Sequence, residues 1–414
     1  MSAQLLSLEN PATNEVLQTL AMPDAEQVRA MIANARRAAL AWRWTSMAER
    51  IAITQRFVAE MRKRQEEVAR EITLQMGKPI KQARNEVNTM IDRANYMAEI
   101  APAALADEML PDKLGFMRKI AHEPRGVVLD IAAWNYPLLI SINIVAPAIL
   151  AGNAVLLKHS SLTPLCALRM QEAYRAAGLP EGVLQAVVID REGAEALLTS
   201  PAIDAVFFTG SVPGGYEVYK KAAAGLKRVG LELGGKDPAY VRADADLATT
   251  VPNVADGAFY NCGQSCCAVE RIYVDQKIYP EFLAAFLSEV KSYKTGDPLA
   301  EETYLGPLAQ KKQVGVLEEQ VREAVQRGAK VLLGGNAPTH NGRGNYFEPT
   351  IVVNVTNDMK AMQEESFGPI IGILPVAGDE EAVRLMNDSR FGLTASIWSR
   401  DEKAALELAP HIEA

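Results

Sequence analysis

Two adjacent cysteines, Cys266 and Cys267, follow a Gly-Gln-Ser sequence and precede an apolar run at residues 271–274 that is typical of a strand. Earlier in the chain, Glu232 is the single carboxylate of another apolar run, which ends in two glycines. If the two groups meet in the fold, the thiolate is a nucleophile and the carboxylate is a base that activates a later water molecule. Spacing alone leaves another interpretation open, in which both cysteines are buried structural residues, because cysteine is among the most buried residue types.

Asn135 and Lys158 each lie at the end of an apolar run, and both are candidates for ligand binding. The amide of Asn135, beside a backbone N–H, is a candidate donor to an oxyanion, although asparagine is also common in turns. Ligands of parallel sheets bind at the carboxyl ends of the strands, so Lys158 could bond ribose hydroxyls or could simply be an exposed lysine. The residue types leave both interpretations open at each position.

A glycine-rich turn between an apolar run and a helical segment contains Gly210, Ser211 and Gly215. Backbone N–H groups at the start of such a helix would accept a phosphate. The spacing differs from the G-x-G-x-x-G pattern, so an ordinary glycine-rich turn fits these residues equally well.

The elements that must position these groups follow a regular alternation between residues 127 and 234. Short apolar runs alternate with helical segments, which predicts βαβ units and a parallel sheet covered by helices on both faces, as in doubly wound dinucleotide-binding domains. The predicted strands are residues 127–131, 154–157, 183–188, 205–208 and 229–233.

The rest of the chain is organised around this domain. The N-terminal region is predicted to be helical, with the last helix ending just before Pro102. Beyond residue 235 the alternation restarts, which predicts a second α/β unit. We expect a dinucleotide-binding domain at residues 1–101 and 123–234, a bridging hairpin at 102–122 and a catalytic α/β domain at 235–414.

Composition excludes several functional classes. The chain has 414 residues and a formal net charge of −8, which argues against binding to nucleic acid or to a membrane surface. Its four cysteines are too few for a disulfide framework, and the sequence shows neither a signal peptide nor a membrane span. No Cys/His spacing suggests a metal site. We therefore expect a cytoplasmic protein without a metal.

Six short motifs, taken together and in order, resemble those of the aldehyde dehydrogenase superfamily. They are Trp-Asn-Tyr-Pro at 134–137, Lys-His-Ser-Ser at 158–161, Phe-Thr-Gly-Ser at 208–211, Glu-Leu-Gly-Gly-Lys at 232–236, Gly-Gln-Ser-Cys at 263–266 and Glu-Glu-Ser-Phe-Gly-Pro at 364–369. The resemblance covers essentially the whole chain. It implies oxidation of an aldehyde to a carboxylic acid with NAD or NADP as the cofactor, and a doubly wound dinucleotide-binding domain, a catalytic α/β domain and a small oligomerisation hairpin.

The resemblance also implies catalytic roles. Cys266 resembles the nucleophile, Glu232 the general base, and Asn135 the oxyanion donor that acts with the backbone N–H of Cys266. In such an enzyme the thiolate attacks the aldehyde, hydride leaves to the nicotinamide, and the base activates water to hydrolyse the thioester. None of the four histidines takes a catalytic position of the family pattern, which disfavours a Cys–His protease.

Further residues are implied to contact the cofactor or the substrate. The implied cofactor-binding residues are Ala133, Trp134, Lys158, Ser161, Gly210, Ser211, Gly215, Leu233, Glu365 and Phe367. The implied substrate-pocket residues are Tyr136, Asn143 and Tyr260. Tyr136 and Asn143 suggest a semialdehyde or another polar aldehyde, although Asn143 could instead face a neighbouring helix.

The sequence departs from the family pattern at two places. Many NAD-preferring members have a glutamate where this chain has Ser161, so we expect tolerance of NADP or even preference for it. The family's last segment, with a substrate loop and an arm that pairs with a partner subunit, is absent from this sequence. We expect a homodimer or homotetramer only for a chain that includes it.

Two alternative functions remain open at this stage. One is a CoA-acylating semialdehyde dehydrogenase, which Glu232 disfavours because members that use CoA often lack this base. The other is a catalytically silent protein of the same fold that binds a cofactor or has a structural role. The intact set of Cys266, Glu232 and Asn135 disfavours this second alternative.

Overall fold

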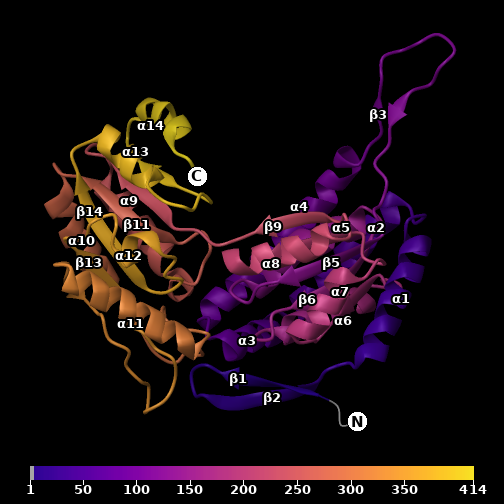
Figure 1. Cartoon of the computed structure of the whole chain (residues 1–414), viewed down its shortest axis with the longest axis horizontal. Helices are drawn as coiled ribbons and strands as arrows, with labels where there is room; N and C mark the ends of the chain where they lie inside the picture. Colours follow the sequence, from indigo (N-terminus) through magenta and orange to yellow (C-terminus); the bar gives the residue numbers. More distant parts are fainter. Residues whose placement is uncertain (1–3) are drawn as a thin grey trace. The chain divides into compact units, whose positions relative to one another are not determined.

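The computed structural model describes residues 4–414 and divides into two compact units (Figure 1). Each unit is described by itself. The first unit contains the described residues up to Glu9, together with Val16–Ile72 and Ala83–Leu233. The second unit contains Asn10–Glu15, Thr73–Gln82 and Gly234–Ala414.

The first unit is built on a five-stranded parallel sheet with the order β7-β6-β5-β8-β9. The strands β6 and β7 are added on one side of β5, and the chain then returns to add β8 and β9 on the other side. This is the doubly wound topology expected from the sequence. Every residue of the central strand β5 is buried, as expected for a strand covered on both faces. The strands are β5 (Val127–Ala132), β6 (Ala154–His159), β7 (Leu184–Ala186), β8 (Ala205–Thr209) and β9 (Arg228–Glu232).

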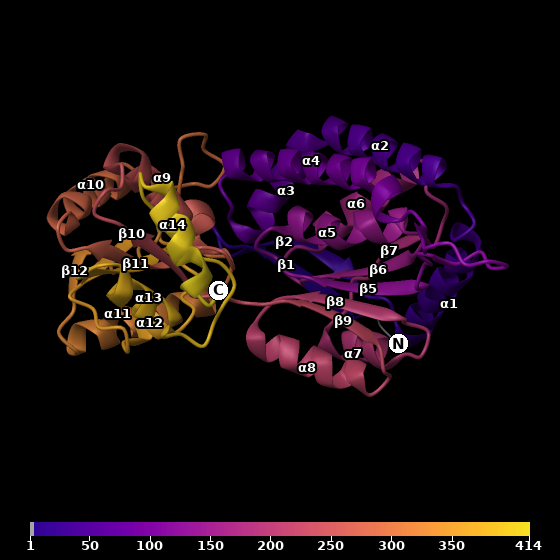
Figure 2. The ribbon, with the colours of Figure 1, turned by 90° about the horizontal axis from the view of Figure 1, so that it is seen from above.

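Helices cover both faces of this sheet (Figure 2). Helices α2, α5 and α6 pack together on one face, whereas α7 and α8 lie on the other. A buried apolar cluster joins α1, α7 and α8 to β5, β6 and β8. The helices in this part of the chain are α1 (Ala25–Trp42), α2 (Met47–Lys63), α3 (Gln65–Met76), α4 (Ile80–Ala104), α5 (Pro137–Leu150), α6 (Pro164–Ala176), α7 (Arg191–Thr199) and α8 (Val212–Ala223). The end of α3 and the start of α4 belong to the second unit.

The prediction for the N-terminal region is wrong in two respects. The chain opens with two strands, β1 (Leu5–Asn10) and β2 (Glu15–Ala21), which pair through a turn that holds Asn14 at a φ of 58°. Helix α4 also continues past Pro102, and Leu105 N–H donates to Ala101 at 3.0 Å. The proline lacks an N–H and so removes one hydrogen bond of the helix, and the loss is small because the helix ends only two residues later, at Ala104.

A small hairpin follows α4, formed by β3 (Glu108–Met109) and β4 (Lys119–Ile120) in antiparallel pairing. The hairpin extends away from the rest of the first unit (Figure 1). Its tip carries exposed apolar side chains, including Leu114, Phe116 and Met117. Its role in oligomerisation stays a prediction.

The second unit contains a six-stranded sheet with the order β12-β13-β14-β11-β10-β15, parallel except for the β12–β13 pair. Helices α9 and α10 lie over one face, and α11, α12 and α13 lie over the other (Figure 2). The strands are β10 (Asp237–Val241), β11 (Val269–Asp275), β12 (Lys330–Leu333), β13 (Thr350–Val353), β14 (Ile370–Val376) and β15 (Ser396–Trp398). The helices are α9 (Leu247–Phe259), α10 (Tyr279–Lys291), α11 (Lys311–Gln326), α12 (Lys360–Gln363), α13 (Asp379–Asn387) and α14 (Glu402–Leu408).

Within residues 4–414, no helix combines the length and the apolar character that crossing a bilayer requires.

His159 fastens the starts of α5 and α6 to the end of β6. Its Nε2 lies 2.9 Å from the Pro137 carbonyl oxygen, and its Nδ1 lies 3.0 Å from the Thr163 hydroxyl. A carbonyl can only accept, so Nε2 carries the hydrogen and the neutral ring accepts from Thr163 at Nδ1. Burial lowers the pKa of His159 to about 4.

We predict that acid selectively destabilises this part of the fold. Below the ordinary histidine pKa of 6.5, the unfolded chain binds a proton that the folded chain excludes until about pH 4. Stability is therefore lost as pH falls through this window, by on the order of 3 kcal/mol at its lower end. Urea unfolding midpoints at pH 7 and pH 4.5 measure this loss. His159→Gln should show a smaller pH dependence, and an equal dependence in both proteins would contradict the assignment.

Candidate active site

The predicted residues of the first unit gather at one edge of its sheet. In the parallel register Ile131 pairs with both Lys158 and Phe208, and Thr209 pairs with Glu232. The four strands therefore end side by side. Asn135 follows β5 at this edge, close to the switch point where the strand order reverses, which is where doubly wound sheets bind ligands.

The position of Asn135 is fixed by the start of α5. The asparagine is 3% exposed and stands two residues before Pro137, the first residue of the helix. The side chain of the N-cap residue does not cap the helix, and Glu86 of α4 does so instead, accepting from the Leu138 N–H at 2.9 Å. A carboxylate at a helix N-terminus is favourable because it satisfies free N–H groups and the helix dipole.

Sequence reasoning missed Glu86. Its only signal is a carboxylate within the predicted helical region, and nothing local indicates that it caps a helix much later in the chain.

The glycine-rich turn leads into α8, and two structural requirements, helix capping and close packing, explain its residue types. Ser211 is the N-cap, and its hydroxyl accepts from the Gly214 N–H at 3.3 Å. A Cβ on Gly210 would lie 2.6 Å from the Phe208 ring, and one on Gly215 would lie 2.6 Å from Leu233. The glycines are thus required by packing. Pro213 has no N–H and Ser211 already accepts from Gly214, so the start of α8 offers a phosphate mainly the positive end of the helix dipole.

Lys158 and Ser161 lie on the same edge. Lys158 is half-buried in β6, and burial lowers its pKa, an effect that Asp190 opposes. Ser161 is exposed in the turn before α6. An ammonium group with little water around it is well placed to donate to ribose hydroxyls, so the fit to a dinucleotide is good at this position.

The remaining predicted residues of the first unit surround this edge. Ala133, Trp134 and Tyr136 are half-buried in the loop between β5 and α5. Asn143 is exposed on α5, and Glu232 is exposed at the end of β9, where its carbonyl accepts from the Gly210 N–H at 3.0 Å.

The predicted residues of the second unit gather at the amino ends of its strands, whereas those of the first unit gather at the carboxyl ends. Gly235 precedes β10, Cys266 precedes β11 and Phe367 precedes β14, and these three strands are neighbours in the sheet. A Cβ on Gly235 would lie 2.8 Å from the carbonyl oxygen of Cys266. The register of parallel strands therefore brings three distant motifs into contact.

The loop that carries Cys266 is held rigidly. Asn261 and Cys262 adopt left-handed φ values of 54° and 60°, which are uncommon for residues other than glycine. Gln264 is 1% exposed, bonds the Asn261 carbonyl at 3.0 Å and accepts from the Ala309 N–H at 2.9 Å. Strained backbone of this kind persists only where the surroundings fix it.

Cys266 is half-buried and Cys267 is exposed, with the two sulfurs 3.6 Å apart. The hydrogen bond with Cys267 raises the pKa of Cys266 well above its ordinary value, and burial and the Asp237 carboxylate act in the same direction. The resting thiol therefore keeps its proton and needs a base before it can act as a nucleophile. Tyr260 is half-buried at the start of this loop.

Glu365 lies directly against the Gly-Gly segment that precedes β10. A Cβ on Gly234 would lie 2.4 Å from the Glu365 carboxylate, which accepts from the Gly235 N–H at 3.1 Å. Burial raises the pKa of Glu365 to about 7, and the charge of Glu270 adds to the effect. Phe367 has a left-handed φ of 47°.

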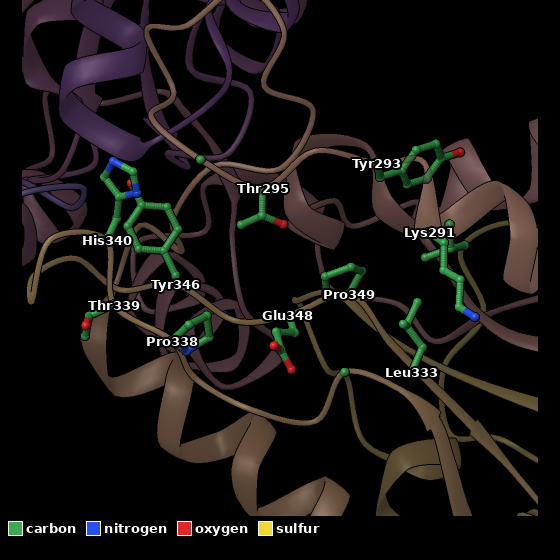
Figure 3. A pocket seen from close by; sticks show the side chains of 13 residues that line it. Lys291, Tyr293, Thr295, Leu333, Pro338, Thr339, His340, Tyr346, Glu348 and Pro349 are labelled. Carbon is green, nitrogen blue, oxygen red and sulfur yellow. The ribbon is translucent and has the colours of Figure 1, made fainter.

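A separate cavity of the second unit contains none of the predicted site residues. It has a volume of about 380 Å³ and lies between the end of α10 and the loop that follows β12. His340 and Tyr346 lie on one side of it, Lys291 and Leu333 lie on the other, and Glu348 stands between them (Figure 3). Within residues 4–414, no three His, Cys, Asp or Glu side chains are grouped so that they could hold a metal ion.

The profile of the aldehyde dehydrogenase family matches residues 2–414. The chain belongs to this family. It is 36% identical over 404 residues to a succinate-semialdehyde dehydrogenase [NADP(+)] of Deinococcus radiodurans, covering 98% of this chain and 84% of that protein. It is 38% identical over 405 residues to a succinate semialdehyde dehydrogenase [NAD(P)+] of Escherichia coli K12, covering 98% and 87%.

Solved structures agree with this assignment. An NAD-dependent aldehyde dehydrogenase from Sinorhizobium meliloti superposes with a TM-score of 0.95 at 36% identity, covering 99% of this chain and 82% of that one. The fold class predicted from the motifs is therefore confirmed, as are aldehyde oxidation and the use of NAD or NADP.

We predict that removing the Cys267 thiol activates Cys266. Cys267→Ala deletes the hydrogen bond that contributes most to the high pKa of Cys266, so more thiolate forms at a given pH. Iodoacetamide labelling of the Cys266 peptide, followed by mass spectrometry across pH, should become severalfold faster at pH 8. Cys166→Ala, which removes a buried cysteine of the first unit, is the matched control. An unchanged pH profile in Cys267→Ala would show that the neighbouring thiol has no such influence.

Proposed function

We propose that this aldehyde dehydrogenase oxidises a semialdehyde that carries a carboxylate, of the succinate semialdehyde type. The names of both curated relatives support this substrate class. Tyr136 is the N-cap of α5 and follows Asn135 directly in the chain, and Asn143 lies about two turns into the helix. We propose that both contact the substrate together with Tyr260.

We propose Cys266 as the nucleophile, Asn135 as the oxyanion donor and Glu232 as the base. The Cys266 sulfur attacks the aldehyde carbon once its proton has passed to solvent water, and the aldehyde oxygen becomes negatively charged. The Asn135 amide and the Cys266 backbone N–H donate to that oxygen and lower the barrier. After oxidation the acyl group is a thioester on Cys266, and Glu232 takes a proton from the water that hydrolyses it.

The dinucleotide, when bound, supplies the hydride acceptor for the oxidation. We propose that the first turn of α8 bonds the pyrophosphate, that Lys158 bonds ribose hydroxyls, and that Trp134 and Leu233 line the same crevice. In the second unit we propose that Glu365 bonds the nicotinamide ribose and that Phe367 packs near the ring. The half-buried ammonium group of Lys158 and the positive end of the α8 dipole are the features that support this cofactor.

The roles of Cys266 and Glu232 are separable by kinetics. Cys266→Ala should form no NADPH from succinate semialdehyde. Glu232→Gln should form one equivalent in a burst and then stop, because the thioester is no longer hydrolysed. Stopped-flow absorbance at 340 nm measures both, with succinate semialdehyde tested against uncharged aldehydes of similar length. Sustained turnover in Cys266→Ala would overturn the assignment, and turnover that depends on added CoA would favour acyl transfer to CoA.

We propose that Ser161 permits NADP, because a hydroxyl does not repel a 2′-phosphate. Ser161→Glu places a carboxylate at this position, and the ratio of kcat/KM for NADP to that for NAD should fall by about tenfold or more. Ser161→Gln has a similar size without the charge and should change the ratio much less. A ratio that Ser161→Glu leaves unchanged would remove Ser161 from cofactor selection.

A further inference from the structure

A buried ion pair lies in the second unit, outside the set of proposed catalytic residues. Lys236 is 1% exposed and Glu270 is 3% exposed, and the Lys236 Nζ lies 2.7 Å from Glu270 Oε2. Taking both charges out of water costs several kcal/mol, and a buried ion pair is often no more stable than apolar residues of the same volume. Stability alone is thus a weak reason for this pair.

The hydrogen bonds of the pair converge on a single turn. The Glu270 carboxylate accepts from the backbone N–H of Ser366 at 2.8 Å and from that of Phe367 at 3.0 Å. Lys236 Nζ also donates to the Ser366 hydroxyl at 2.9 Å, and that hydroxyl donates to Gln320 at 2.8 Å. The turn is therefore held from both its backbone and its side chain.

This turn needs an anchor because its backbone is strained. Phe367 has a φ of 47°, a conformation that costs a bulky residue about 1–3 kcal/mol and persists only when the surroundings fix it. A carboxylate is suited to the task because its two oxygens can accept from two consecutive N–H groups at once. An apolar side chain accepts neither bond, and an amide offers one acceptor oxygen where the two N–H groups bond two different carboxylate oxygens.

The two residues that flank Ser366 are those proposed to contact the nicotinamide half of the cofactor, Glu365 and Phe367. Lys236 is continuous in the chain with Gly235, whose N–H bonds Glu365 at 3.1 Å. On the other side, Arg271 Nε donates to the Lys236 carbonyl at 2.8 Å and fixes the start of β10. The ion pair thus connects the amino ends of β10, β11 and β14.

We infer that Glu270, paired with Lys236, is a positioning residue that holds Glu365 and Phe367 in the conformation that receives the nicotinamide ribose and ring. This inference rests on the cofactor roles proposed for Glu365 and Phe367. Glu270 itself does not touch the substrate or the cofactor, since its carboxylate is occupied by the turn and by Lys236.

Glu270→Gln tests the inference. The amide keeps the shape but leaves Lys236 without its counter-charge and one backbone N–H without its acceptor, so the turn relaxes. We expect the KM for NADP to rise by about tenfold or more, which corresponds to about 1.4 kcal/mol of lost binding. The KM for the aldehyde and the iodoacetamide labelling rate of Cys266 should change by less than about twofold.

Two further variants separate positioning from stability. Asp379→Asn removes the counter-charge of Arg242, whose Nε lies 3.0 Å from Asp379 in the same unit, and it should lower the melting temperature without raising the KM for NADP. The double variant Lys236→Met with Glu270→Gln removes the uncompensated buried charge, so it should recover melting temperature relative to Glu270→Gln. Its KM for NADP should stay high, because the bonds to the turn are still incomplete.

The outcomes are decisive in each direction. The inference is overturned if Glu270→Gln leaves the KM for NADP unchanged, or if the double variant restores that KM together with the melting temperature. Glu365→Gln distinguishes this failure from failure of the proposed cofactor site. If Glu365→Gln raises the KM while Glu270→Gln does not, only the positioning role fails. If Glu365→Gln has no effect on the KM, the cofactor role of Glu365 fails and the inference fails with it.

Discussion

In a parallel sheet all strands have their amino ends on one side and their carboxyl ends on the other. In both sheets of this chain, this arrangement brings together residues that are distant in sequence. In the first unit, the register that pairs Ile131 with Lys158 and Thr209 with Glu232 places the strand ends side by side. In the second unit, the segments before β10, β11 and β14 meet at the amino ends of adjacent strands. A shift in register would separate these groups, so the backbone ladder is the constraint on which the chemistry depends.

Close backbone approach is the second requirement. Gly234 lies so near the Glu365 carboxylate that a Cβ would come within 2.4 Å of it, and a Cβ on Gly215 would come within 2.6 Å of the Leu233 side chain. Nothing larger than glycine fits without moving these partners. The glycines of the motifs are thus explained by packing, and the phosphate site that we propose depends on the start of α8, where the helix dipole is positive, rather than on the glycines themselves.

The electrostatics of the second unit favour a protonated resting thiol. Cys267, burial and Asp237 all raise the pKa of Cys266, while burial keeps the Glu365 pKa near 7. A thiol in this state is a weak nucleophile until a base removes its proton.

The sequence by itself determined the alternation of elements, because apolar runs and turn residues are local signals. It predicted the strands from 127 to 233 to within a few residues, and it named the motifs whose family membership the comparisons confirm. It missed the β1–β2 hairpin, whose strands are largely exposed, and the passage of α4 beyond Pro102. These depend on pairing and on helix length rather than on local residue type.

Only the tertiary structure decided which side chains hold the predicted residues in place. Glu86 accepts a hydrogen bond from the start of a helix that lies 52 residues later in the chain. Glu270 accepts one from a turn that lies 96 residues later. Neither carboxylate carries a local signal, because a capping or anchoring role is defined by the backbone N–H groups that the fold brings to it. The residue types of the site can be identified along the chain, whereas their supports exist only after the sheets have formed.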